Sequence, residues 1–525
     1  MFALVHVPAE SSAQSKRTAK GSQAKKPNFL VIMTDDQTVA DLRVMTRTKA
    51  LLADKGVSFR NSFVSYPVCC PSRATFFSGQ YAHNHKVMGL YPPTGGYGKF
   101  DMDNSLGSWL QRSGYHTGHI GKMLNGYGSD TPADVPRGFN EWYAAVDPST
   151  YRMHGYTLNE NGTFVTYGQP DVEDPATYQT DVLANKAVDY IRRNAQNPFF
   201  LSLAFVAPHH EQFQIRKQTG KTVRAAPRHT GMFSNAQLPI PPNFGEPDLT
   251  DKPEYVQRRS PPLTQTDVEQ IAANYRERQE SLLALDEAVE SLMKTLSQTG
   301  TLRNTYVIFT SDNGFLQGEH RVRSGKLLAY EPSIRVPLLI RGPGLAKGRE
   351  SAELVANTDL APTILEAAEA RPGKVVDGRS LLPYADNPSL GSKRVLLLET
   401  GGARVGQIEQ DAGPVRPLPN VLTYSGVRTR RYKYISYRNG AKELYDLNRD
   451  PYELRSLHDA PRYLEARIAL RRELIRLKTC RGEVCRQDSR PIPGRGPRIE
   501  TFLGLGPTPV PAPQPEPVPP PARRR

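Results

Sequence analysis

Three mainly apolar runs, each followed directly by a polar cluster, constrain the fold of this chain most strongly. They are residues 28–33 (NFLVIM), 199–206 (FFLSLAFV) and 305–310 (TYVIFT). Continuous apolar runs of this length are typical of strands buried on both faces, as in a parallel sheet covered by helices. Residues 266–296 have the apolar spacing of a covering helix. We therefore expect an α/β fold with a large, mostly parallel or mixed sheet sandwiched by helices.

The polar clusters supply oxygen and nitrogen ligands where these strands end. Asp35 and Asp36 follow the first run, residues 207–210 (APHH) follow the second, and Asp312 and Asn313 follow the third. In open α/β sheets, ligands bind outside the carboxyl ends of the strands. Each acidic pair alone is typical of a turn or a helix cap. Together, their four side chains could converge on one hard divalent cation, such as Ca²⁺ or Mg²⁺.

A cysteine segment, residues 67–73 (PVCCPSR), adds a second kind of chemistry. Pro71 can open a helix in its first turn, which leaves Cys69 beside unsatisfied backbone N–H groups. Arg73 then lies one turn further on the same face. This environment favours an anion, a thiolate or a charged transition state. The alternative is a buried loop of small residues with a surface arginine.

Together, these motifs resemble those of the sulfatase family. Residues 67–79 (PVCCPSRATFFSG) resemble its Cys-x-Pro-Ser-Arg signature, and residues 114–124 (GYHTGHIGKML) resemble its second signature. The acidic clusters and the pair Gly325–Lys326 follow one another along the chain in the same order as in the family. Residues 443–451 (ELYDLNRDP) resemble a segment of the family's C-terminal domain, so the resemblance runs from about residue 27 to residue 486. It implies an alkaline-phosphatase-like fold and a sulfuric ester hydrolase.

The resemblance implies that Cys69 is oxidised to Cα-formylglycine after translation, by a formylglycine-generating enzyme as maturation partner. Cys70 then occupies the variable position of the signature. One hydroxyl of the hydrated aldehyde would attack sulfur and form a covalent ester, which divides a difficult displacement into two steps.

The resemblance also implies one divalent cation per chain, which is Ca²⁺ in most of the family. Its ligands would be Asp35, Asp36, Asp312 and Asn313. The cation would attract a sulfate oxygen and offset charge in the transition state.

The remaining implied roles fall on basic side chains. Arg73 and Lys122 would stabilise the hydrated aldehyde, and Lys326 would bind the sulfate group. His209 would act as general acid toward the leaving oxygen, with its neighbour His210 as the rival assignment.

One departure from the family pattern concerns the second signature. Many sulfatases have a histidine two residues after its lysine, where this chain has Leu124 followed by Asn125. With the Cys-Cys-Pro-Ser-Arg segment and residues 81–85 (YAHNH), this makes the chain similar to the N-acetylglucosamine-6-sulfatase branch. The implied substrate is a sulfated small molecule or glycan of the glucosamine-6-sulfate type. His83 and His85 could line the site or pack beneath it.

Three alternatives remain at the level of the sequence. A phosphomonoester or phosphonate monoester hydrolase of the same superfamily shares the sheet edge and the metal. Many phosphatases of that class need a second metal, and no second ligand set is evident. A sulfatase-like protein that stays unmodified would be an inactive binding protein. A basic module that binds nucleic acid or acidic glycans through its ends is the third alternative.

The chain is predicted to have four segments: a basic, disordered arm (1–26), a catalytic α/β domain (27–385), a smaller α+β domain (386–486) and a proline-rich, disordered tail (487–525). The net charge of +15 is concentrated in the arm and the tail. We therefore expect no nucleic-acid partner. No apolar run reaches the ~18 residues of a spanning helix, so we expect no membrane span.

The location of the protein depends on the cysteines and the beginning of the chain. Cys480 and Cys485 bracket Arg-Gly-Glu-Val, a spacing that a turn could close into a disulfide. That bond would favour an oxidising compartment. No leader is recognisable in this sequence. We expect a secreted or cell-envelope protein, and a cytoplasmic location stays open.

Overall fold

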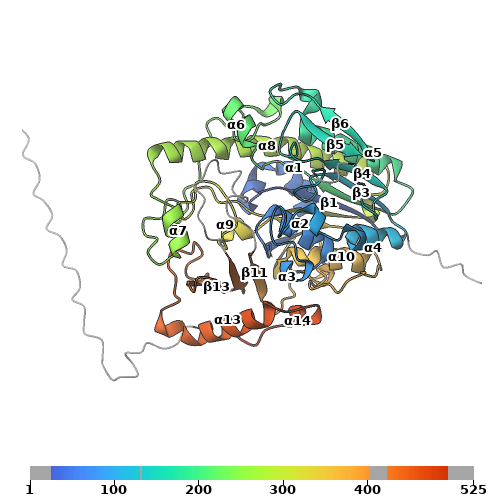
Figure 1. The fold of residues 1–525 in the computed structure, drawn as a ribbon. Helices are drawn as coiled ribbons and strands as arrows, with labels where there is room; N and C mark the ends of the chain where they lie inside the picture. Colours follow the sequence, from blue (N-terminus) through green and yellow to red (C-terminus); the bar gives the residue numbers. More distant parts are fainter. Residues whose placement is uncertain (1–24, 130–132, 402–422, 495–525) are drawn as a thin grey trace, which may run out of the picture.

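The centre of the protein is a mixed sheet of ten strands (Figure 1). The computed structural model describes residues 25–129, 133–401 and 423–494. The strands are β1 (Asn28–Thr34), β2 (Val57–Phe63), β3 (His116–Gly121), β4 (Glu141–Ala145), β5 (Tyr156–Glu160), β6 (Thr163–Tyr167), β7 (Phe199–Ala204), β8 (Thr305–Ser311), β9 (Leu338–Arg341) and β10 (Arg349–Ala356).

The strand order explains how distant segments meet. It runs β10-β2-β9-β8-β1-β7-β3-β4-β5-β6, with β8, β1, β7, β3 and β4 parallel to one another. Strand β9 is antiparallel to β2 and β8, and β5 and β6 form an antiparallel edge. The three apolar runs predicted as buried strands are β1, β7 and β8, and they are neighbours. Their carboxyl ends therefore open onto one edge, as predicted.

Helices cover both faces of the sheet (Figure 1). The α-helices of the described residues, including those outside the large sheet, are α1 (Thr46–Thr48), α2 (Cys69–Ser78), α3 (Ala82–His85), α4 (Leu106–Arg112), α5 (Gln179–Arg193), α6 (Phe213–Thr219), α7 (Glu254–Arg259), α8 (Gln265–Gln298), α9 (Glu331–Ile334), α10 (Leu360–Ala367), α11 (Leu382–Asp386), α13 (Leu464–Leu477) and α14 (Glu483–Arg486).

Alternation along β1 assigns its side chains to two apolar cores. Phe29 and Val31 pack with apolar residues of α2, α4 and α10, whereas Leu30 and Ile32 pack with those of α5 and α8. Side chains of a strand alternate between faces, so a strand that is apolar throughout can serve both cores. The predicted fold class, a large sheet sandwiched by helices, is confirmed.

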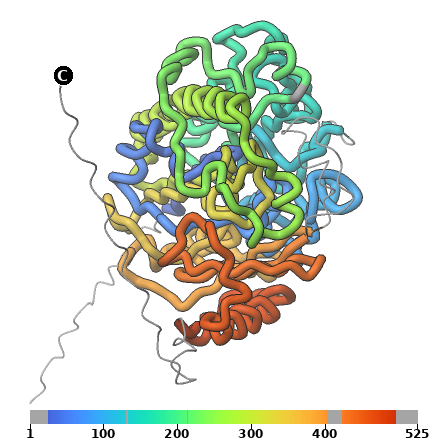
Figure 2. Tube along the Cα trace, turned by 90° about the vertical axis from the view of Figure 1, so that its left-hand side faces the viewer, coloured from blue at the N-terminus to red at the C-terminus, as the bar shows by residue number. Residues whose placement is uncertain are grey.

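A second, antiparallel sheet follows the first in the chain. Its strands are β11 (Leu396–Glu399), β12 (Tyr424–Arg428), β13 (Tyr432–Tyr437) and β14 (Lys442–Asp446). Helix α13 packs against it through a separate apolar core, and the orange and red segments of Figure 2 show this layer beneath the large sheet. A smaller α+β unit was predicted here, and the segment boundaries at 385 and 486 remain predictions. Most of the predicted arm and tail lies outside the described residues.

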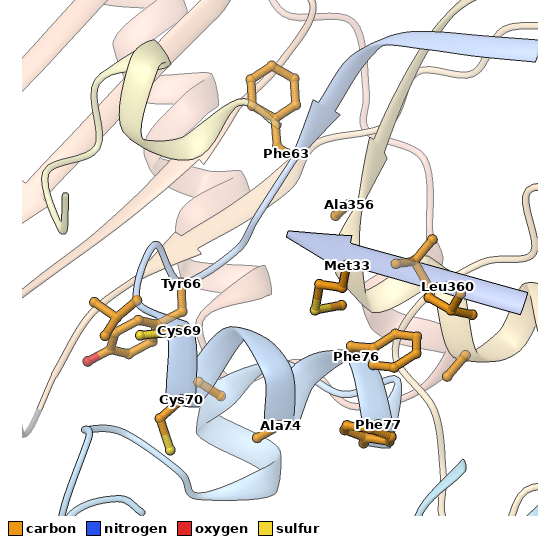
Figure 3. Packing of buried hydrophobic residues seen from close by; sticks show 14 of the residues in the cluster. Met33, Phe63, Tyr66, Cys69, Cys70, Ala74, Phe76, Phe77, Ala356 and Leu360 are labelled. Atoms are coloured by element: carbon orange, nitrogen blue, oxygen red, sulfur yellow. The ribbon is translucent and has the colours of Figure 1, made fainter. Parts of the chain in front are cut away.

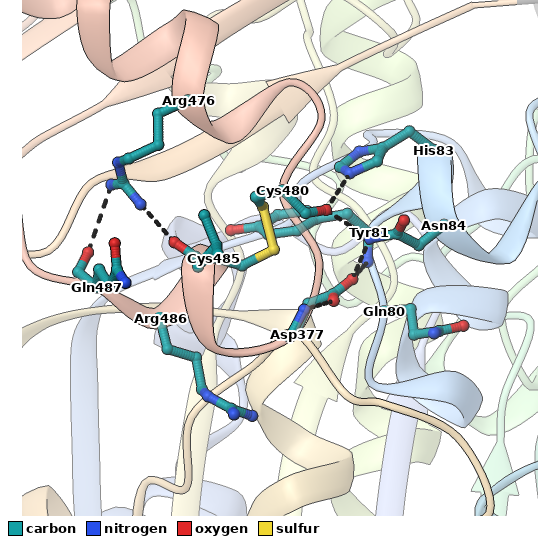
Figure 4. The surroundings of a disulfide bond; sticks show 12 residues. Gln80, Tyr81, His83, Asn84, Asp377, Arg476, Cys480, Cys485, Arg486 and Gln487 are labelled. Carbon is teal, nitrogen blue, oxygen red and sulfur yellow. Dashed lines mark hydrogen bonds between the residues drawn. A yellow bond between two sulfur atoms is a disulfide. The ribbon is translucent and has the colours of Figure 1, made fainter.

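A disulfide bond links Cys480 and Cys485, whose Cα atoms are 5.1 Å apart, as the spacing suggested (Figure 4). The bridged loop contacts the segment of α3. The backbone oxygen of Cys480 lies 2.8 Å from Nε2 of His83, and Asn84 donates to the same oxygen. Nε2 of His85 lies 3.0 Å from the hydroxyl of Thr75. Both histidines therefore pack between elements.

A buried ion pair joins the smaller sheet to the helical layer of the large sheet. Arg394, just before β11, donates from its Nη2 atom to Oδ1 of Asp359, which precedes α10, at 2.7 Å. Its side chain is only 3% exposed. Removing one partner of a buried pair leaves an uncompensated charge.

We expect Arg394→Ala to lower the free energy of unfolding by about 3–5 kcal/mol, because Asp359 stays buried without its partner. Arg258→Ala is the control: Arg258 pairs with Glu254 at 2.5 Å, and the two side chains are 67% and 66% exposed. That loss should be about 1 kcal/mol or less. Urea unfolding of both variants measures the difference. Equal losses would contradict a special role for Arg394.

Candidate active site

Cys69 opens α2 at the carboxyl edge of the large sheet. Val68, in an extended conformation, is the N-cap, and Gly79 ends the helix with a φ of +65°. Figure 3 shows Cys69 and Cys70 at the start of α2, with Phe76 and Phe77 toward its other end in the apolar core. The helix is anchored by buried residues, so Cys69 is held in place with the helix N-terminus beside it.

Two acidic pairs meet next to Cys69. Asp35 and Asp36 come directly after β1, and Asp312 and Asn313 come directly after β8, where the two strands pair in parallel. The backbone N–H of Asp36 donates to Oδ1 of Asp312 at 3.4 Å, and Asn313 donates from Nδ2 to Oδ1 of Asp36. All four residues are buried. The structure thus brings together the four side chains that the resemblance names as ligands.

Asp36 has a φ of +66°. The left-handed region costs a non-glycine residue roughly 1–2 kcal/mol. Arg278 of α8, fully buried, donates to the backbone oxygen of Asp36 at 2.6 Å and to that of Pro208 at 2.9 Å. It therefore joins the ends of β1 and β7 beneath the site. Sequence reasoning missed Arg278, because its place in a long polar helix resembles that of a surface arginine.

Basic side chains surround the carboxylates. Arg73 is 2% exposed, not a surface residue, and its Nε donates to Oδ2 of Asp312 at 2.7 Å. Lys122, directly after β3, forms a short ion pair with Asp35. Nζ of Lys326 lies 2.5 Å from Oδ1 of Asp36 and 3.7 Å from Sγ of Cys69.

The Lys326 loop is held between two distant parts of the chain. The N–H of Leu327 donates to the backbone oxygen of Pro67 at 3.2 Å. The hydroxyl of Tyr424 on β12 donates to the backbone oxygen of Leu327 at 2.8 Å. The smaller sheet therefore contributes to the position of Lys326 without providing a side chain to the cluster around Cys69.

Burial and charge set the protonation of this cluster. Burial raises the pKa of Asp35, but Lys122, His209, Lys326 and Arg73 overcome it and hold the pKa below its usual range. Burial raises the pKa of Asp312, and the charge of Asp35 adds to the increase.

Burial also raises the pKa of the Cys69 thiol, more than Lys122 and Lys326 lower it. Unmodified Cys69 is therefore a neutral thiol, which is a poor nucleophile.

Three oxygen atoms of the four predicted ligands are suited to a cation. Oδ1 of Asp35, Oδ2 of Asp36 and Oδ1 of Asn313 are buried without a hydrogen-bond partner. A buried polar atom without a partner is costly, and oxygen atoms are the ligands that Ca²⁺ prefers. The residues present therefore fit a hard divalent cation. Ligand atoms of Asp35 and Asp36 lie within 4.8 Å of His209, and those of Asp35 and Asp312 lie within 4.8 Å of Cys69.

The two neighbouring histidines have different surroundings. Nε2 of His209 lies 3.6 Å from Oδ2 of Asp36, and its Nδ1 lies 2.7 Å from the backbone oxygen of His210. The His210 ring packs edge-on against Phe315, with ring centroids 5.1 Å apart. The geometry therefore places His209 on the side of the acidic cluster.

Tyr151, in the loop between β4 and β5, is a second residue that sequence reasoning missed. Its hydroxyl oxygen lies 3.9 Å from Sγ of Cys69, and its ring lies 4.4 Å from that of His209. Asn125, just past the second signature, donates to the Tyr151 hydroxyl oxygen at 2.6 Å. No sequence pattern marks Tyr151 itself.

Comparison with known families accounts for this constellation. A family model described as Sulfatase matches residues 27–370, and one described as N-sulphoglucosamine sulphohydrolase, C-terminal, matches residues 418–480. The chain belongs to the sulfatase family. It is accordingly a sulfuric ester hydrolase, as predicted.

Curated relatives extend the match over most of the chain. An arylsulfatase from Volvox carteri is 34% identical to this sulfatase, over 88% of this chain and 76% of the relative. The human N-acetylglucosamine-6-sulfatase is 32% identical, over 90% of this chain and 88% of the relative. A Drosophila melanogaster relative named an extracellular sulfatase is 31% identical, over 72% of this chain and 33% of the relative.

Solved structures share the fold. A protein in complex with its substrate D-glucosamine-2-N,6-O-disulfate has a TM-score of 0.72 and 22% identity, covering 88% of this chain and 98% of that one. A phosphonate monoester hydrolase from Silicibacter pomeroyi has a TM-score of 0.66 and 21% identity, covering 86% and 95%. Within the described residues, the helices of this sulfatase include none with the length and apolar character needed to span a membrane.

We expect Ca²⁺ to raise the melting temperature of EDTA-treated wild-type protein, because the cation binds only the folded state. At about 100 times its Kd it should add about 2.7 kcal/mol. Asp36→Ala should lose most of this shift, and the exposed control Asp54→Ala should keep it. Differential scanning fluorimetry with and without Ca²⁺ measures each shift. An equal shift in Asp36→Ala and wild type would place the cation elsewhere.

Proposed function

We propose that this sulfatase hydrolyses sulfate monoesters of a sulfated sugar, of the glucosamine-6-sulfate type, with formylglycine at position 69 and one divalent cation. The observation that carries the proposal is the position of Cys69, at the N-terminus of α2 and 3.7 Å from Nζ of Lys326, beside the buried acidic cluster. An unmodified thiol with a raised pKa is poorly suited to attack. A hydrated aldehyde at this position would supply a hydroxyl nucleophile.

The cation would be held by Asp35, Asp36, Asp312 and Asn313. When bound, it would supply positive charge to a sulfate oxygen. Its identity as Ca²⁺ follows from the family resemblance and from the all-oxygen donor set. Asp312, whose pKa is raised by burial and by the charge of Asp35, is placed to accept a proton from the group at position 69.

Three basic residues have the roles of binding sulfate and of stabilising the charge at position 69. Lys326 lies between Cys69 and Asp36, so its Nζ can bind a sulfate oxygen at the nucleophile. Arg73 and Lys122 orient the acidic side chains and place positive charge beside position 69. These fixed charges need no reorganisation as negative charge develops on the sulfate.

His209 is the proposed general acid. Its Nδ1 lies 2.7 Å from the carbonyl oxygen of His210, which can only accept, so Nδ1 carries a proton. In the imidazolium form, Nε2, which faces the acidic cluster, would carry the proton that is given to the leaving oxygen.

The sugar class is supported by the relatives. The mammalian relatives named N-acetylglucosamine-6-sulfatase align with most of this chain, and Leu124–Asn125 replaces the histidine of the second signature, as noted for that branch. A sulfated glycan or its fragments is the proposed partner, and a formylglycine-generating enzyme acts during maturation. The Cys480–Cys485 bond and the relative named extracellular support a secreted or cell-envelope location.

The alternative is a phosphonate monoester or phosphomonoester hydrolase, which the likeness of fold to the Silicibacter pomeroyi enzyme favours. Among the described residues, the two groups suited to a metal ion share Asp35 and lie in the same cluster. Preference for phosphate or phosphonate esters over every sulfate ester would decide for the alternative.

We expect Cys69→Ala to abolish turnover of 6-sulfated glucosamine, because it removes the proposed nucleophile. Cys70→Ala is the matched control, a neighbouring buried cysteine whose pKa burial raises to about 12 and which has no assigned step. It should keep substantial activity. Sulfate release by ion chromatography, on protein co-expressed with a formylglycine-generating enzyme, measures both. The opposite pattern would assign the nucleophile to Cys70.

A further inference from the structure

Tyr151, which lies outside the sequence motifs, brings its hydroxyl close to Cys69. Its oxygen is 3.9 Å from Sγ of Cys69, within the range of a hydrogen bond to sulfur. Leu124, at the position where many sulfatases have a histidine, is apolar and 2% exposed, and it offers no polar atom to this side. Tyr151 supplies one from a different segment.

Two contacts to the ring hold Tyr151 in place. Nζ of Lys122 lies 4.4 Å from the centre of the ring, a distance typical of a cation–π contact. The ring of His209 lies 4.4 Å away at an interplanar angle of 34°. Tyr151 therefore contacts the residue proposed as nucleophile, one of the cations and the proposed general acid, and its ring cannot move without disturbing them.

Asn125 determines the direction in which the Tyr151 hydroxyl can donate. It donates from Nδ2 to the phenolic oxygen at 2.6 Å, so that bond uses a lone pair of the oxygen and leaves the O–H proton available. Sγ of Cys69, 3.9 Å from the phenolic oxygen, lies in reach of that proton. Burial raises the pKa of Tyr151 well above its ordinary value, which keeps the phenol protonated.

We propose that Tyr151 is a further catalytic residue of this sulfatase, which donates a hydrogen bond to the oxygen carried by the modified side chain at position 69. Asn125 is its positioning residue, acting through the phenolic oxygen. The inference rests on the proposed function, because the acceptor exists only when Cys69 has been converted to an aldehyde. We infer that the acceptor is a hydroxyl oxygen of the hydrated aldehyde, so that the bond stabilises the hydrate, which carries the attacking hydroxyl, relative to the free aldehyde.

The proposed contact is with position 69 and not with the sugar, so the expected effect is on kcat rather than on KM. Tyr151→Phe removes the donor and keeps the ring against Lys122 and His209. A hydrogen bond to a group that develops charge is worth roughly 10- to 100-fold in rate. We expect kcat to fall by about that factor, with KM changed by less than about threefold, because uniform binding is retained. The fall should be similar for a small aryl sulfate and for glucosamine-6-sulfate.

Asn125→Asp tests the direction of the hydrogen bond without changing the size of the side chain. A carboxylate cannot donate to the phenolic oxygen and would instead accept its proton. We therefore expect Asn125→Asp to lower kcat to a similar extent. Tyr97→Phe is the matched control, because Tyr97 is buried and its hydroxyl donates to Asp134 at 2.6 Å. It should retain kcat within about twofold, since its hydroxyl makes no contact with the transition state.

The decisive experiment measures aldehyde labelling as well as turnover. Wild type, Tyr151→Phe, Asn125→Asp and Tyr97→Phe are each incubated with methoxyamine, and intact mass follows the labelling of position 69. Methoxyamine reacts with the free aldehyde and not with the hydrate. Loss of the Tyr151 bond should therefore speed labelling in Tyr151→Phe and Asn125→Asp, and Tyr97→Phe should be labelled at the wild-type rate. Melting temperatures identify any variant that is merely unfolded.

The outcomes separate this inference from the proposed function. Wild-type protein that is never labelled would show that position 69 carries no aldehyde, which would contradict the proposed function as well. If wild type is labelled, and Tyr151→Phe has the same labelling rate and the same kcat as wild type, the role of Tyr151 alone would be overturned. A rise in KM confined to the sugar substrate would also overturn it, because Tyr151 would then contact the sugar.

Discussion

The structure depends on a balance of buried charge at the carboxyl edge of the large sheet. Three carboxylates and the amide of Asn313 meet three cations, Arg73, Lys122 and Lys326, almost entirely out of contact with water. Neither set is stable there alone, because an isolated buried charge costs several kcal/mol. Parallel pairing of β1 with β8 and β7 brings the groups to one point, and helix α2 adds its N-terminus.

The same balance explains why distant elements are needed. Arg278 reaches from α8 to the backbone of Asp36, and Tyr424 reaches from the smaller sheet to the loop of Lys326. Each donates a hydrogen bond to a backbone oxygen next to the site. These bonds fix the chain at positions with positive φ, Asp36 at +66° and Leu327 at +81°. The site is therefore held by the whole fold, including the layer that contains no proposed catalytic residue.

Sequence patterns predicted the parts of this arrangement that local physics determines. The apolar runs of β1, β7 and β8 and the helical spacing of α8 were recognisable because burial on both faces leaves continuous apolar segments. The acidic pairs and the Cys69 segment were recognisable because their chemistry depends on residue type and spacing. Short antiparallel strands such as β5 and β6 were not predicted, since their side chains are partly exposed and carry a weak pattern.

Long-range contacts could not be predicted in the same way. Tyr151 lies in a loop without periodicity, and only the fold places its hydroxyl beside Cys69. Arg278 has the spacing of an ordinary helical arginine, and its burial becomes evident only when α8 packs on the sheet. That His209 faces Asp36 while the ring of His210 packs on Phe315 likewise became evident only in the structure. In each case the deciding partner is far away in the sequence.

The most direct test of the account is a mass spectrum of the peptide that contains position 69, taken from protein with measured sulfatase activity. The account predicts that the cysteine thiol has been replaced by an aldehyde at position 69, with Cys70 unchanged. Fully active protein with an intact thiol at position 69 would contradict it.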